Sequence, residues 1–144
     1  VGPLGSGYLE DIIAIGAGVQ HCIALKNDGT LWAWGYNNDG QLGQGSTYMY
    51  SQYPVQVVGV GNIGFLTDVI SISVGMNHTL ALLSNGTIVG FGYNLEGQLG
   101  INTTNNENVP NELSLENAQT IFAGGDHSFA IESDGTVWSW GKNA

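Results

Sequence analysis

Short runs of apolar and β-branched residues follow one another along the chain, each ended by a turn that contains glycine. Residues 11–17 and 21–25 form two such runs, and residues 31–34 form a third. The runs lack the three-to-four-residue apolar spacing of an amphipathic helix. Runs of this length between turn signals are typical of β-strands. The pattern therefore predicts an all-β chain.

Three dipeptides mark the tight turns between runs: Asp28-Gly29, Asn85-Gly86 and Asp134-Gly135. A two-residue type I′ turn needs positive φ at both central positions, which Asn-Gly and Asp-Gly provide most readily. We therefore expect a type I′ hairpin at each of the three places.

The same order of motifs recurs three times. In each copy a glycine precedes a histidine by three residues, and the hairpin turn begins seven residues after the histidine; the histidines are His21, His78 and His127. A strand such as Leu31-Trp32-Ala33-Trp34-Gly35 follows the turn, and the first two copies continue as Gly-Tyr-Asn-x-x-Gly-Gln-Leu-Gly. Repeats of about 50 residues indicate stacked or radially arranged structural units.

Each unit is expected to hold four short strands, the fourth starting after Pro54 in the first copy and after Pro110 in the second. Proline suits the start of an edge strand, where its missing N–H breaks no ladder bond. Four antiparallel strands per unit of about 50 residues describe one blade of a β-propeller. We interpret residues 1–144 as one repeat region with units 1–57, 58–113 and 114–144, the last incomplete.

These signatures resemble the regulator of chromosome condensation repeat family. The resemblance rests on Gly-x-x-His, the Asp-Gly-Thr turn, Trp-x-Trp-Gly and Gly-Tyr-Asn-x-x-Gly-Gln-Leu-Gly, and it covers essentially the whole chain. It implies a seven-bladed ring, of which this chain holds about two and a half blades. An open stack exposes strand edges and apolar faces at both ends. We expect a fragment of a longer propeller, or alternatively copies that associate to cover those ends.

Charge and cysteine content narrow the possible partners. The chain has 2 basic and 12 acidic residues, a formal net charge of −10, so we expect no nucleic-acid partner, because phosphate binding needs clustered Lys or Arg. Its apolar runs are far shorter than the roughly 20 residues of a membrane helix, so no membrane partner is expected either. Cys22 is alone, which excludes an intrachain disulfide and a cysteine-based metal site. The compartment is not indicated.

Histidine and tryptophan could suggest a metal or ligand site, but a structural role is favoured for both. His21, His78 and His127 fall on different blades, so each is expected to bond to backbone within its own blade rather than to a shared ion. The four indoles, which alternate within Trp-x-Trp, are expected to pack between blades; they are Trp32, Trp34, Trp138 and Trp140. We expect no catalytic set, no metal and no cofactor.

The loop at residues 44–53 breaks the repeat and is the candidate partner-binding segment, through Tyr48, Met49, Tyr50 and Tyr53. Tyrosine and methionine are enriched in protein interfaces. The alternative, that these side chains cover the adjacent blade, stays open.

The function that follows is a non-enzymatic protein–protein interaction scaffold. Its partner would be another protein, or further copies or blades of the same propeller. The resemblance also implies an alternative, guanine-nucleotide exchange on a small GTPase, which the charge of −10 disfavours. A secreted inhibitor or surface-binding propeller is the third possibility.

Overall fold

The computed structural model describes residues 2–46 and 48–143, which form three antiparallel sheets and two short 3₁₀ turns. The first sheet contains β1 (Ile12–Ala17), β2 (His21–Lys26), β3 (Leu31–Tyr36) and β4 (Tyr50–Gln56). The second contains β5 (Val69–Val74), β6 (His78–Leu83), β7 (Ile88–Gly92) and β8 (Glu107–Glu112). The third contains β9 (Ala118–Gly124), β10 (His127–Glu132) and β11 (Val137–Gly141). The 3₁₀ turns are η1 (Pro3–Gly5) and η2 (Val60–Asn62).

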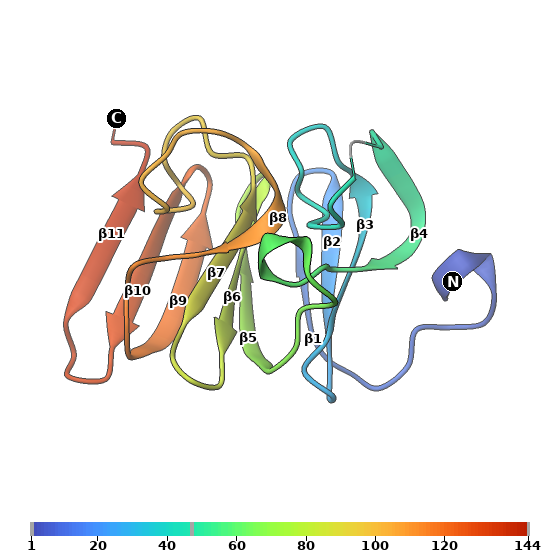
Figure 1. Cartoon of the computed structure of the whole chain (residues 1–144), viewed down its shortest axis with the longest axis horizontal. Coiled ribbons are helices and arrows are strands. Elements are labelled where there is room, and N and C mark those ends of the chain that lie inside the picture. The colour runs from blue at the N-terminus through green and yellow to red at the C-terminus, as the bar shows by residue number, and fades with distance from the viewer. Residues whose placement is uncertain (1, 47, 144) are drawn as a thin grey trace.

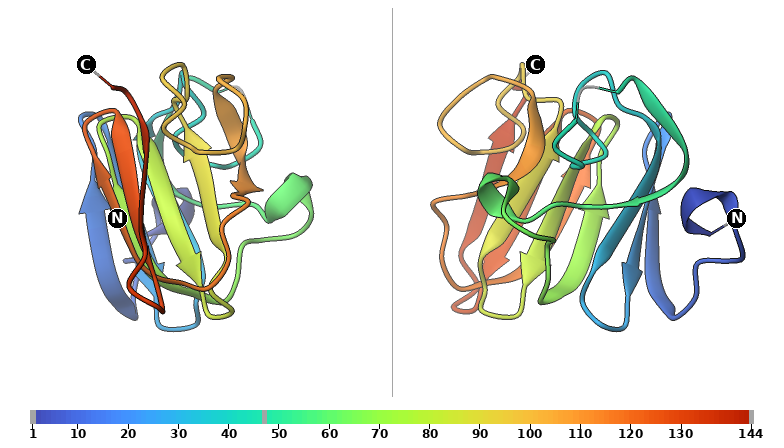
Figure 2. Two further views of the ribbon diagram at one scale, coloured as in Figure 1. Left: turned by 90° about the vertical axis from the view of Figure 1, so that its left-hand side faces the viewer. Right: turned by 45° about the vertical axis from the view of Figure 1, so that its right-hand side comes forward.

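The three sheets stand side by side like propeller blades, with the second between the other two (Figure 1). Within each sheet the strands follow chain order, so each sheet is a simple meander of hairpins, as the rotated views also show (Figure 2). The predicted all-β blade architecture is confirmed. The predicted unit boundaries fall in the connections between sheets and stay a prediction, and the end positions Val1 and Ala144 lie outside the described residues.

The apolar core lies between the sheets. One cluster joins Leu31 of the first sheet to Phe91 of the second, and another joins Ile88 of the second to Ile121 of the third. Because alternate residues of a strand face opposite ways, β6 and β7 of the middle sheet each supply side chains to both clusters. The blades are thus held together mainly by burial of apolar surface between neighbours.

The hairpins do not have the predicted type I′ form. In the first hairpin Gly29 has φ +80°, whereas Asn27 and Asp28 keep negative φ. The N–H of Gly29 donates to the Lys26 carbonyl at 3.0 Å, and the N–H of Lys26 donates to the Thr30 carbonyl at 3.0 Å. This is a type I turn followed by a left-handed glycine, the usual three-residue hairpin loop. The dipeptide was a sound hairpin signal, but the turn is one residue longer.

The two strand prolines lie inside β4 and β8 rather than before them. Pro54 is buried opposite Trp34, where the register shifts between Ala33 and Gly35, and Pro110 is buried opposite Phe91, where the β7–β8 register shifts in the same way. A β-bulge leaves a residue out of the ladder, so a proline there costs no hydrogen bond. No helix in the described part of the chain is long and apolar enough to cross a membrane.

Candidate protein-binding surfaces

The repeated histidines link each blade to the next. His21 Nε2 lies 3.3 Å from Thr79 Oγ1 of the second blade, and His78 Nε2 lies 2.9 Å from Ser128 Oγ of the third. Thr79 and Ser128 each follow the histidine of their own blade by one residue. The prediction that each imidazole bonds to backbone in its own blade was wrong for His21 and His78, because each ring bonds to a hydroxyl of the next blade instead.

The protonation of His78 follows from its neighbours. Ser128 Oγ donates its single proton to the Gln98 carbonyl at 2.8 Å, so the hydroxyl must accept from His78 Nε2–H. Nδ1 of His78 is buried without a hydrogen-bond partner among the described residues. Burial, with smaller contributions from His21 and His127, lowers the pKa of His78 to about 4, and burial lowers the pKa of His21 to about 4. Both rings are therefore neutral structural bridges at neutral pH.

His127 occupies the same repeat position but is exposed, because the described residues place no blade beyond the third sheet. Its ring lies edge-on to Phe129, with 5.4 Å between the ring centroids. Within residues 2–46 and 48–143, no three His, Cys, Asp or Glu side chains are grouped so as to hold a metal ion. The three imidazoles are spread over successive blades.

Two buried amide side chains shape the loop that follows the third strand of the first two blades. Asn37 accepts from the Leu42 N–H at 3.0 Å and donates to the Tyr48 carbonyl at 2.7 Å. Asn94 repeats this arrangement in the second blade, with the Leu99 N–H at 2.8 Å and the Thr103 carbonyl at 2.8 Å. The recurrence of these two amides at one repeat position is the sequence signal that indicates their structural role.

The candidate loop is exposed over most of its length. The exposed fractions are 76% for Tyr48, 62% for Met49, 61% for Tyr50 and 42% for Tyr53. Tyr50 is the first residue of β4 and pairs with Tyr36 of β3. Tyr53 packs against Gly5 of η1. The loop thus presents three large side chains to solvent, and Tyr53 is the most covered of the four.

The backbone of this loop is nevertheless held in place. Besides the bond from Asn37 to the Tyr48 carbonyl, the backbone N–H of Asn37 donates to the Met49 carbonyl at 2.7 Å. Beside the loop is a hollow of about 500 Å³ lined by Gln44, Tyr48, Met49, Tyr50, Ser51 and Val55. Anchored backbone and exposed aromatic side chains together make a surface that can bind a partner at a low entropic cost.

The four tryptophan side chains pack between blades to different extents. Trp140 packs on the second cluster and donates from Nε1 to the Gln98 carbonyl at 2.8 Å. Trp138, two residues earlier on the same face of β11, is 49% exposed, so its packing between blades is incomplete. Trp32 and Trp34 are half-buried on the face of β3 that is turned away from the second sheet.

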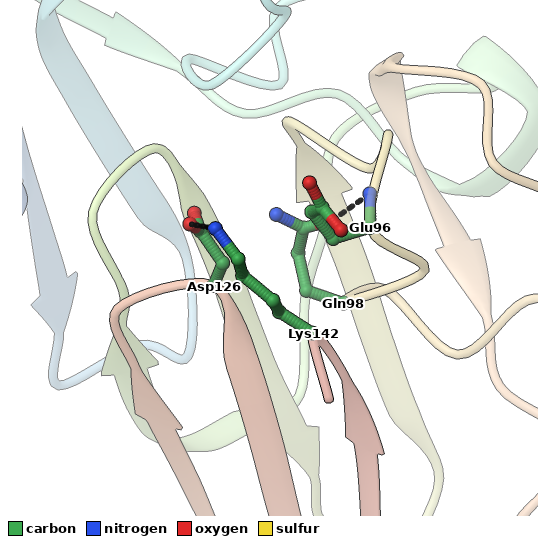
Figure 3. A network of polar contacts seen from close by, with 4 residues as sticks. All are labelled: Glu96, Gln98, Asp126 and Lys142. Carbon is green, nitrogen blue, oxygen red and sulfur yellow. Dashed lines mark hydrogen bonds and ion pairs between the residues drawn. The ribbon is translucent and has the colours of Figure 1, made fainter. Parts of the chain in front are cut away.

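Three charged side chains, Glu96, Asp126 and Lys142, lie near the C-terminal end of β11 (Figure 3). Lys142 Nζ lies 4.0 Å from Asp126 Oδ2, an exposed pair that contributes little to stability. Nearby, the backbone N–H of Glu96 donates to Gln98 Oε1 at 3.1 Å.

Comparison with known proteins places this architecture in a family. Two family models described as regulator of chromosome condensation (RCC1) repeat match the chain, one over residues 28–82 and 85–131 and the other over residues 12–41, 69–98 and 119–144. The matches follow the repeat period and together span all three blades.

Two curated relatives illustrate the range of proteins that contain such repeats. The human "Probable E3 ubiquitin-protein ligase HERC6" is 31% identical over 146 residues, which cover 94% of this chain and 14% of that protein. The Danio rerio "Protein RCC2 homolog" is 32% identical over 147 residues, which cover 97% of this chain and 29% of that protein. The chain thus spans less than a third of the length of either relative.

Two solved structures of yeast RCC1 agree with the fold. Prp20p from Saccharomyces cerevisiae, in a structure whose title names binding to Gsp1p and histones, superposes with a TM-score of 0.78 at 26% identity, covering 92% of this chain and 34% of that one. Yeast RCC1 (Prp20) in a complex with Kap60 gives a TM-score of 0.79 at 25% identity, covering 92% and 32%. With three repeats matched in sequence and three blades matched in structure, this chain belongs to the regulator of chromosome condensation (RCC1) repeat family.

Proposed function

We propose that this chain is a protein-interaction scaffold whose 48–53 loop contacts another protein. The observation that carries the proposal is the exposure of Tyr48, Met49 and Tyr50 on a backbone that Asn37 holds in place. Large aromatic and thioether side chains on an ordered loop are typical of interface centres. The corresponding stretch of the second blade, residues 101–108, is rich in Asn and Thr instead, so the two blades differ where a partner would be chosen.

The partner should be neutral or basic at its contact surface. With 12 acidic and 2 basic residues, the chain repels an acidic protein and attracts a basic one at low salt. The likeness to yeast RCC1, solved in a complex with Kap60, supports a protein partner for this chain as well. The chain spans only part of its relatives, and as part of a longer propeller it would contribute this loop to a larger surface.

Site-specific photo-crosslinking tests the loop directly. A benzophenone amino acid at Tyr48 should yield a defined crosslinked partner from the native source, whereas the same group at Thr104, in the equivalent loop of the second blade, should not. Replacing Tyr48, Met49 and Tyr50 together by Ala should abolish capture, while replacing Thr103 and Thr104 by Ala should leave it unchanged. Equal crosslinking at both loops would contradict the proposal.

A second candidate is nucleotide exchange on a small GTPase, supported by the structural likeness to Prp20p, for which binding to Gsp1p is named. A release assay with a labelled guanine nucleotide on a small GTPase separates the two functions. Accelerated release would favour exchange, and binding without acceleration would favour the scaffold.

A further inference from the structure

The hairpin turns of the three sheets lie together at one end of the molecule, which we call the hairpin end (Figure 1). The Val69 N–H donates to the Gly29 carbonyl and the Ala118 N–H to the Gly86 carbonyl, each at 3.1 Å, so each turn touches the first strand of the next sheet. Most of the negative charge lies at this end. Its acidic residues are Glu10, Asp11, Asp28, Asp68, Glu112, Glu116, Glu132 and Asp134.

The first strand of each sheet carries a β-bulge at the hairpin end. The register shifts leave Ile13, Ile70 and Gln119, which occupy one repeat position, out of their ladders. A bulge re-aims the side chain of the residue that leaves the ladder. Ile70 is 57% exposed although described sheets flank it on both sides, and Ile13 is 61% exposed. The bulges thus present large apolar side chains to solvent at the acidic end.

Ile70 lines a hollow of about 310 Å³ between the second and third sheets. Leu83 and Ala118 add to its apolar lining, while Asn85 and Gln119 contribute uncharged polar groups. None of the lining residues that the structure describes is charged. An apolar side chain can therefore enter this hollow without stripping water from an ion.

Carboxylates surround the hollow. Asp68, Glu116 and Asp134 each lie one or two residues along the chain from a residue that lines it. Among the described residues these three carboxylates form no ion pair. Hydrogen bonds from the backbone and side chain of Thr136 lower the pKa of Asp134, so this carboxylate is charged at neutral pH. The charge around the hollow selects a basic occupant.

We propose that the hollow between the second and third sheets binds a short segment of another protein in which one apolar side chain is flanked by lysine or arginine. The apolar side chain packs on Ile70, and the flanking basic groups meet Asp68 on one side and Glu116 and Asp134 on the other. A second copy of this acidic chain would bring like charges together. The surface is separate from the 48–53 loop, which begins β4 at the opposite end of the sheet.

The probe is an end-blocked, fluorescein-labelled peptide, Gly-Lys-Arg-Leu-Arg-Lys-Gly, followed by fluorescence polarisation. Replacing its leucine by serine should weaken binding about tenfold, because the apolar contact with Ile70 is lost. A peptide with glutamate in place of every basic residue should not bind. Raising the salt concentration from about 0.05 to about 0.3 M should weaken binding of the leucine peptide, because it screens the charges.

Three chain variants locate the site. Ile70→Ser, an exposed change outside the strand ladder, should reduce binding of the leucine peptide about fivefold or more, toward that of the serine peptide. Asp134→Asn should weaken binding about twofold, and Asn85→Asp should strengthen it by about as much. Both changes preserve the turn, because Asp28, Asn85 and Asp134 each accept the backbone N–H of the threonine two residues later.

Matched variants at the opposite end of the sheets separate a local site from general charge attraction. Glu96→Gln removes the same net charge as Asp134→Asn, and Met76→Ser removes an apolar side chain that is 49% exposed; both should leave peptide binding unchanged. A triple Ala variant at Tyr48, Met49 and Tyr50 should also bind the peptide normally, so this proposal and the proposed function fail independently.

Four results would overturn the proposal. They are no binding by the parent chain, equal affinity for the leucine and serine peptides, equal losses in Glu96→Gln and Asp134→Asn, and unchanged binding by Ile70→Ser. A dimer in sedimentation velocity that Ile70→Ser abolishes would assign the hollow to a second copy of the chain instead.

Discussion

Mild acid should destabilise this protein through its two inter-blade histidines. His21 and His78 are buried and have a pKa of about 4 in the folded chain, against 6.5 when unfolded. Between these values the unfolded chain binds more protons, so the free energy of unfolding falls as the pH falls. The contribution of the two imidazoles is present in full above pH 6.5 and is lost progressively toward pH 4.

The size of the effect follows from the same values. At about pH 5 each histidine costs about 2 kcal/mol of folding free energy relative to neutral pH, and the pair about 4 kcal/mol. Domains of this size are stable by only about 5–15 kcal/mol. Two carboxylates shift in opposite directions: hydrogen bonds from the side chain and backbone of Thr30 lower the pKa of Asp28, whereas burial raises the pKa of Asp39. The raised pKa of Asp39 favours the folded chain in acid, opposite in sign to the imidazoles, so the histidine contribution is isolated by comparing variants.

Urea unfolding followed by tryptophan emission at several pH values between about 5 and 7.5 measures the slope. His78→Gln keeps an N–H donor for Ser128 but cannot titrate, so its slope should be roughly half that of the parent chain. His127→Gln, at the same repeat position but exposed, is the matched control and should keep the parent slope. A parent chain with equal unfolding midpoints at both ends of the range, or equal flattening by both variants, would refute the reasoning.

Three further substitutions test the packing and the loop. Phe91→Ala should lower the free energy of unfolding by about 3–5 kcal/mol, because the ring is fully buried between two blades, as chemical denaturation can measure. Gly92→Ala should cost more than about 1 kcal/mol in the same assay, since φ is +105° and a Cβ would lie 2.5 Å from the Asn77 carbonyl oxygen; unchanged stability would contradict that geometry. Asn37→Ala should speed proteolysis within residues 44–53, because the Tyr48 carbonyl and the Leu42 N–H lose their partner; an unchanged cleavage rate would show that the loop is held otherwise.

The fold was largely predictable because the same order of sequence motifs occurs in three copies. A histidine, a hairpin turn and a Trp- or Phe-containing strand recur in the same order, and agreement between copies removes the ambiguity that a single short apolar run leaves. The details inside each copy were less predictable. Asp28-Gly29 indicates a hairpin but not the length of its loop, and Pro54 indicates an edge strand but not the bulge that accommodates it.

The candidate partner-binding loop was also predictable from the sequence only in part. Tyr48, Met49 and Tyr50 could be singled out because they break the repeat, yet whether they face solvent or a neighbouring blade depends on the path of the loop. That path is set by Asn37, whose bonds reach residues up to twelve positions away. The local sequence shows that the Asn37 amide recurs in the second copy, but it does not show which backbone groups this amide hydrogen-bonds.

The order of strands, the number of units and the identity of the turn residues are properties of the sequence alone, because they depend on contacts between residues close along the chain. The partner of each histidine is a property of the tertiary structure. Ser128 lies fifty positions from His78, and only the stacking of one blade on the next brings hydroxyl and imidazole together. The same stacking buries Phe91 and leaves Trp138 half-exposed, although the two side chains belong to the same kind of strand. The neighbouring blades therefore determine which side chains of each repeat are buried.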